Sequence, residues 1–186
     1  QRTVAALLAV AGVFLVPAVA SAHISVAGPG FANTTQEIVF DVGHGCAGAD
    51  TYSVKVEIPS VVTGVRPMRS DFGKVSVETN AAEDVIAITW QKDDAELHAR
   101  DIGYYKLSVR LKVPNQPFTT LYFPTHQTCK ASDGTLTTTH WIGTPENSGG
   151  AEPPEPAPAL QEVPARKAGW NKFTVPVDVP DLSLYF

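Results

Sequence analysis

The 186-residue sequence has little positive charge, only two cysteines and one methionine, and no common catalytic signature. Its 14 Lys and Arg stand against 19 Asp and Glu, so we expect no basic surface of the size that nucleic acid or an anionic membrane requires. No GxSxG, HExxH or P-loop motif occurs. The single methionine, Met68, is too few for a thioether-rich Cu(I) site. We therefore predict no nucleic-acid partner and no enzyme of these classes.

The first 22 residues have the pattern of a removable secretory signal. Residues 4–20 form an apolar block that is preceded by Arg2 and followed by the small-residue run Ala20-Ser21-Ala22. A bilayer span needs about 20 apolar residues, which is longer than this block. We predict a signal peptide over residues 1–22 with cleavage before His23, and an uncleaved membrane anchor is the alternative. The chain starts with Gln, so we expect a few residues to be missing before it.

The two cysteines, Cys46 and Cys129, suit an exported protein with one disulfide bond. A metal-binding pair is the alternative. The two residues lie far apart in the sequence and neither belongs to a CxxC motif, so their spacing matches no known metal site. We predict that they form a disulfide.

From His23 to about Trp141 the chain consists of short alternating segments separated by Gly, Pro, Asn and Asp. In "TYSVKVEI", for example, Tyr52, Val54 and Val56 share one face of a strand. Period two with β-branched and aromatic residues is typical of strands, and no window repeats at 3.6 residues. Eight such segments predict an all-β fold, an antiparallel β-sandwich over residues 23–146.

The composition changes at residues 147–168, "NSGGAEPPEPAPALQEVPARKA". Its prolines and small residues are typical of an extended, semi-rigid linker. Apolar alternation resumes in residues 169–186 and stops at Phe186. We expect these last residues to begin a C-terminal segment that the sequence truncates, and the alternative is that they add strands to the sandwich.

A mature N-terminal His23 would offer its α-amine and its ring Nδ1 to one metal ion. Together they close a six-membered chelate, and two nitrogen donors in a plane suit Cu(II). The amine must lose its proton to bind, so the affinity should weaken in acid. The alternative is that the cleavage site precedes a histidine by coincidence.

The remaining histidines are not marked as ligands by spacing. His44 lies in the Gly-rich "GHGC", where a structural hydrogen bond to the backbone is expected. His98 lies in a charged loop and should be solvated. His126 lies near Cys129, and His140 neighbours Trp141 on the opposite strand face. A complete brace with a second histidine therefore has no support from the pattern.

Several separated motifs carry a resemblance to a known family. They are the mature His after the signal, "VFDVGHGCAGADTYSVKVEIPSVVTGVRPM", "TTLYFPTHQTC" and "THWIGTP". In this order they resemble the YcnI-like domain family of exported bacterial copper-binding proteins. The resemblance covers residues 23–146, and "GWNKFTVPV" is similar to the C-terminal continuation of longer members.

The resemblance implies a cupredoxin-like or immunoglobulin-like sandwich and a mono-histidine brace for Cu(II). In that brace one histidine, matched by His23, supplies amine and imidazole, and a strand glutamate, matched by Glu57, supplies an oxygen. A tryptophan beside the metal matches Trp141. From periodicity alone, Glu57 reads as a solvated strand residue and Trp141 as a core or rim residue. His126 departs from the expected apolar position, so an additional ligand there is an open alternative.

These observations predict an exported protein that binds Cu(II) for storage, scavenging or metallochaperone-like delivery. Copper is the expected cofactor, and other copper-handling envelope proteins are the expected partners. We expect the protein in the periplasm or cell envelope, with a membrane tether in the full-length protein as a further option. The alternatives are a copper-dependent oxidase or monooxygenase, which would need a second histidine at the metal, and a metal-free structural β-domain.

Overall fold

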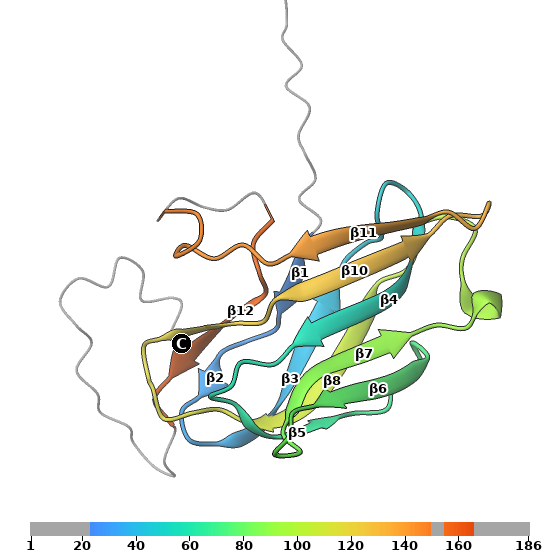
Figure 1. Cartoon of the computed structure of the whole chain (residues 1–186). Coiled ribbons are helices and arrows are strands. Elements are labelled where there is room, and N and C mark those ends of the chain that lie inside the picture. Colours follow the sequence, from blue (N-terminus) through green and yellow to red (C-terminus); the bar gives the residue numbers. More distant parts are fainter. Residues whose placement is uncertain (1–22, 150–154, 166–186) are drawn as a thin grey trace, which may run out of the picture.

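Two antiparallel sheets face each other in the computed structural model, which describes residues 23–149 and 155–165 (Figure 1). The first sheet has the order β1-β3-β8-β5. Its strands are β1 (Ile24–Val26), β3 (Thr35–Val42), β8 (Tyr105–Lys112) and β5 (Thr63–Pro67). The second sheet has the order β11-β10-β4-β7-β6. Its strands are β11 (Leu136–Trp141), β10 (Thr125–Lys130), β4 (Asp50–Glu57), β7 (Val85–Gln91) and β6 (Lys74–Thr79).

The apolar core lies between these sheets because each strand turns alternate residues inward. In β3, Ile38, Phe40 and Val42 are buried, and the facing side chains include Trp90 and Phe123. No α-helix occurs in residues 23–149 or 155–165, where the only helical element is the one-turn 3₁₀ helix η1 (Asp94–Glu96). The prediction of an all-β antiparallel sandwich is confirmed.

Strand β4 follows the predicted alternation except at its start. Val54 and Val56 point into the core as expected. The pairing with β10 shifts by one residue between Thr128 and Cys129, which leaves Tyr52 without a partner in that ladder. Because this β-bulge reverses the faces upstream of it, Thr51 is buried in place of Tyr52.

The disulfide between Cys46 and Cys129 is confirmed, with the two Cα atoms 5.6 Å apart. It joins the tight turn before β4 to the C-terminal end of β10, and both cysteines are buried. The bond therefore fixes the turn that precedes β4 against the strand that carries His126.

The segment expected to be a linker contains a strand of the fold. Strand β12 (Ala159–Val163) lies between β2 (Gly30–Phe31) and β9 (Thr120–Tyr122), parallel to β2 and antiparallel to β9. Leu160 and Val163 are buried, so they contribute apolar contacts that an extended linker would lack. The linker expected over residues 147–168 is therefore corrected: the folded domain continues at least to Val163.

Two expectations concern the two ends of the chain. The signal peptide expected over residues 1–22 and the C-terminal segment expected over residues 169–186 both lie outside the described residues. Within residues 23–149 and 155–165, no helix has the length and apolarity that a bilayer span requires.

Candidate metal centre

The edges of the two sheets bring His23 and Trp141 into contact. His23 directly precedes β1, the edge strand of the first sheet, and Trp141 ends β11, the edge strand of the second (Figure 1). The two rings meet edge to face, with centroids 5.5 Å apart and planes inclined by 66°. His23 is half-buried, whereas Trp141 is only 6% exposed. An indole with so little freedom gives the histidine one fixed, apolar wall.

Gln127 holds Trp141 in this position. The indole Nε1 of Trp141 donates to Gln127 Oε1 at 3.0 Å. Gln127 Nε2 in turn donates to the His44 carbonyl at 2.7 Å and to Thr51 Oγ1 at 2.9 Å. Gln127 is completely buried, so these three bonds satisfy a polar side chain that would otherwise be costly. The sequence interpretation missed Gln127, although alternation in "THQTC" places it on the same buried face as Cys129.

The "GHGC" turn supplies the carbonyl that orients Gln127. Cys46 and Ala49 exchange backbone hydrogen bonds of 3.2 and 2.9 Å, which closes the turn. At Gly45 an added Cβ would lie 1.8 Å from the Ala49 carbonyl oxygen, so only glycine fits. His44 Nδ1 donates to the Gly45 carbonyl at 2.6 Å. This is the kind of structural backbone contact that the sequence predicted for His44.

Glu57 lies in a second cluster, with His126 and His140, on the outer face of the second sheet. His126 Nε2 is 3.1 Å from Glu57 Oε1, and His126 Nδ1 is 2.7 Å from His140 Nδ1. The Glu57 side chain is 50% exposed. His126 and His140 are direct cross-strand partners in the β10–β11 ladder. The structure therefore places the expected oxygen ligand beside the residue that was considered as an extra ligand.

The two clusters lie on opposite faces of β11. Trp141 points inward and is buried, while the adjacent His140 is exposed, because successive strand residues point to opposite faces. Among the described residues, no group of three or more His, Cys, Asp and Glu side chains is arranged to hold a metal ion. After cleavage before His23, this one residue would supply two nitrogen donors beside a rigid apolar wall, a donor set that suits copper. A carboxylate donor from Glu57 would require this side chain to leave His126.

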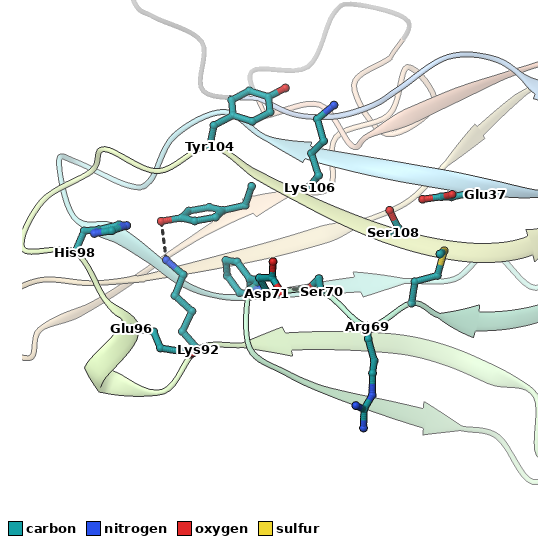
Figure 2. Close-up of a pocket in the computed structure, with 13 residues that line it drawn as sticks. Glu37, Arg69, Ser70, Asp71, Lys92, Glu96, His98, Tyr104, Lys106 and Ser108 are labelled. Atoms are coloured by element: carbon teal, nitrogen blue, oxygen red, sulfur yellow. Dashed lines mark hydrogen bonds between the residues drawn. The ribbon is translucent and has the colours of Figure 1, made fainter.

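A pocket of about 710 Å³ lies elsewhere, at the junction of β7, β8 and the loop before β6 (Figure 2). At its base Lys92 Nζ donates to Asp50 Oδ2 at 2.7 Å and to Tyr105 Oη at 2.6 Å. Tyr105 Oη donates to Asp50 Oδ1 at 2.6 Å, and the His98 backbone N–H donates to Asp50 Oδ2 at 2.9 Å. Figure 2 shows Arg69 directed away from Lys92. The His98 side chain is exposed, as predicted.

The pocket-base residues favour a structural role over a reactive one. Burial alone would raise the pKa of Asp50, but hydrogen bonds from Lys92, Tyr105 and the His98 N–H, with the charge of Lys92, lower it below its usual value. Burial, and then the neighbouring Asp50 carboxylate, raises the pKa of Tyr105, which keeps the phenol protonated as a donor. The Tyr105 hydroxyl and the His98 N–H thus donate to Asp50, and Lys92 donates to both Asp50 and Tyr105, so these groups form an internal network.

Comparison with protein families gives one clear result. The model of a domain of unknown function, DUF1775, matches residues 23–161. The chain belongs to the DUF1775 family. The match extends into β12, in agreement with a domain that continues beyond residue 146. No functionally curated protein matches this DUF1775 chain.

Solved structures support the fold. An uncharacterized protein from Nocardia farcinica, described as having an immunoglobulin-like fold, is 25% identical with a TM-score of 0.62. The alignment covers 77% of this DUF1775 chain and 99% of that protein. The major pilin subunit BcpA of Bacillus cereus, as a D312A variant, is similar at 9% identity and a TM-score of 0.42, over 76% of this chain and 39% of the pilin. The first of these supports an immunoglobulin-like sandwich.

Proposed function

We propose that this DUF1775 protein is an exported copper-binding protein that holds Cu(II) at His23, for storage, scavenging or delivery. The observation that carries the proposal is the contact of His23 with the buried, hydrogen-bonded Trp141. YcnI-like proteins belong to the same DUF1775 family, and the copper-binding motifs that the sequence resembles include both residues. Cleavage before His23 would complete the chelate by freeing its amine.

The chemistry of such a site follows from its donors. Amine and imidazole from one residue bind Cu(II) in a plane, and copper stands highest in the Irving–Williams order. The indole of Trp141 would cover one side of the ion and limit access of water and reductants. A carboxylate from Glu57 would offset part of the metal charge and favour Cu(II) over Cu(I), provided that it moves away from His126.

This role is non-enzymatic and involves other proteins. A copper oxidase or monooxygenase would need a second histidine at the His23 metal, whereas His126 and His140 contact each other on the other face of β11. An open coordination position at His23 would accept a donor from another copper-handling protein of the periplasm or cell envelope. Transfer or storage of the ion is therefore the simpler use of the site.

The test is a Cu(II) titration followed by EPR on protein that begins at His23. We compare it with His23→Ala, which removes the imidazole, and with protein carrying one Ala before His23, which converts the amine to an amide. His98→Ala is the matched control, since that side chain is exposed in a separate loop. We expect the native protein and the control to bind one tight equivalent with nitrogen hyperfine structure.

Both N-terminal variants should lose that equivalent and its spectrum. If His23→Ala binds the first equivalent as tightly as the native protein, with the same spectrum, the His23 site is refuted. Copper would then bind elsewhere, at His126 or His140. Only if no form of the protein binds copper specifically would a metal-free structural β-domain, held by the Cys46–Cys129 bond, be the remaining function.

A further inference from the structure

His126 and His140 form a cross-strand pair on the outer face of the second sheet, and neither belongs to the proposed site at His23. The residues are direct partners in the β10–β11 ladder, and their Nδ1 atoms lie 2.7 Å apart. The other ring nitrogen of His126, Nε2, lies 3.1 Å from Glu57 Oε1. A carboxylate, an imidazole and a second imidazole thus form one continuous chain across three neighbouring strands.

The carboxylate decides where the protons are. Glu57 Oε1 accepts, so His126 Nε2 carries the hydrogen that it donates. In the neutral ring, His126 Nδ1 then bears a lone pair, and His140 Nδ1–H is the donor in the 2.7 Å contact. If the proton on His140 moves to its Nε2, both Nδ1 atoms carry a lone pair, and the two atoms lie 2.7 Å apart. That is the arrangement in which two histidines bind a metal ion.

The separation of the two nitrogens fits a metal ion with little movement. Imidazole nitrogens bind Zn(II) at about 2.0–2.1 Å, so two neighbouring ligands at tetrahedral or square-planar angles are about 2.8–3.4 Å apart. The observed 2.7 Å therefore needs to open by less than about 1 Å. His140 is exposed, so water can complete the coordination and the ion can enter directly.

The geometry points to a divalent-metal site formed by His126 and His140, with Glu57 orienting His126 from behind, that binds an ion of borderline softness such as Zn(II) or Cu(II). A metal-binding histidine commonly donates its second ring N–H to a carboxylate, which fixes the tautomer and raises its basicity. Here Glu57 stands in that position. It acts as a positioning residue and does not itself bind the ion.

This site is spatially separate from the proposed copper site at His23. The His23–Trp141 contact lies on the inner side of β11, and His140 lies on the outer side. Glu57 links the two proposals, because a carboxylate that moves to a metal at His23 would no longer orient His126. Occupation of one site should then weaken the other if Glu57 is shared.

The experiment is a Zn(II) titration by calorimetry of His23→Ala protein, in which the N-terminal chelate is removed. We expect one equivalent to bind. Adding His140→Ala should weaken binding at least tenfold, since one of two ligands is lost. Adding Glu57→Gln should weaken it by about 10-fold, in the range for carboxylates that orient a metal-binding histidine. His98→Ala in the same background is the control and should bind as before.

NMR of the histidine ring protons distinguishes metal binding at His126 and His140 from an indirect structural effect of the substitutions. Zn(II) should shift the ring signals of His126 and His140 and leave those of His98 in place. Thermal unfolding without metal checks that each variant is folded, which we expect for the exposed His140. No Zn(II) binding by His23→Ala, or unchanged affinity in the His140→Ala variant, would overturn the assignment. Loss of Cu(II) at His23 alone would bear only on the proposed function.

Discussion

Replacing Lys92 with Met tests whether the buried Asp50–Lys92–Tyr105 network holds β4 against the β7–β8 side of the fold. Lys92 is 3% exposed and Asp50 is completely buried. The substitution removes the counter-charge of Asp50 but leaves the donors from Tyr105 and the His98 N–H. Breaking a buried ion pair costs about 3–5 kcal/mol, and the two remaining donors place the expected loss near the lower end, about 3 kcal/mol.

The matching double variant separates charge from packing. Asp50→Asn added to Lys92→Met removes the unpaired charge; the amide oxygen can accept from the His98 N–H, and the amide NH2 can donate to Tyr105 Oη, which Lys92 no longer occupies. We expect it to recover most of the lost stability, because replacing both partners is far less costly than removing one. Urea unfolding at pH 7, with m-values compared across variants, measures each free energy. Lys74→Met is the control, since Lys74 pairs with Asp93 on the surface, and should change stability little.

The dependence of the unfolding free energy on pH below about 4 gives a second readout, called here the acid limb. The pKa of Asp50 is lowered in the folded protein, so its ionisation stabilises the fold above the unfolded-state value of 3.8. This contribution is lost as the pH falls through the lower folded-state pKa. Asp50→Asn should flatten that limb. A loss below about 1 kcal/mol for Lys92→Met, with an unchanged acid limb in Asp50→Asn, would refute the reasoning, because typical surface pairs contribute that little.

Three further predictions follow from the described contacts. Replacing both cysteines with serine removes a disulfide that spans 83 residues, and in urea melts it should lower the unfolding free energy by about 4–5 kcal/mol relative to the native protein. In reducing buffer, where the native disulfide is also open, the native protein and the variant should have the same unfolding free energy. Gln127→Leu leaves the Trp141 N–H, the His44 carbonyl and Thr51 without their partner; we expect a loss of about 2–3 kcal/mol and a shifted tryptophan emission. Burial raises the pKa of Glu162, so its ionised form costs stability once the pH rises above the usual value of 4.5. Glu162→Gln should raise the melting temperature at pH 7 but not at pH 4, and an equal effect at both would contradict this.

Local patterns predicted the sandwich because the alternation of buried and exposed positions in a strand depends mainly on that strand's own residues. Val54 and Val56 are buried as the period of two required. The alternation could not reveal the bulge at Tyr52, because a one-residue register shift depends on how β4 pairs with β10. The disulfide was predictable from the number and spacing of the cysteines together with the predicted export of the chain.

Strand β12 escaped prediction for a related reason. Its window is rich in proline, which indicated a linker, and Pro158 lies just before the strand. What makes residues 159–163 a strand is the pair of free edges of β2 and β9, which lie far from it in the sequence. Tertiary pairing of this kind overrides local composition, since buried Leu160 and Val163 offset the entropy of ordering the segment.

The histidine pair could have been found from the hairpin. The turn before β11 contains Asp133-Gly134, a strong hairpin signal, and Gly134 has a φ of 88°. With a three-residue loop over residues 132–134 and Gly134 at its left-handed position, counting outward pairs Lys130 with Leu136 and His126 with His140, as observed. Spacing along the chain hides this relation, because cross-strand partners are set by distance from the turn and not by a fixed interval.

Glu57 connects the two metal proposals and makes their relation testable. In the structure its carboxylate accepts from His126, so a copper ligand role at His23 must compete with this 3.1 Å bond. His126→Phe would remove the competitor while leaving Glu57 in place. If Glu57 binds copper at His23, this variant should bind the ion at least as tightly as the native protein. If copper binding at His23 instead proves insensitive to both His126→Phe and Glu57→Gln, Glu57 serves the outer-face histidines alone, and the His23 chelate takes its oxygen ligand from water.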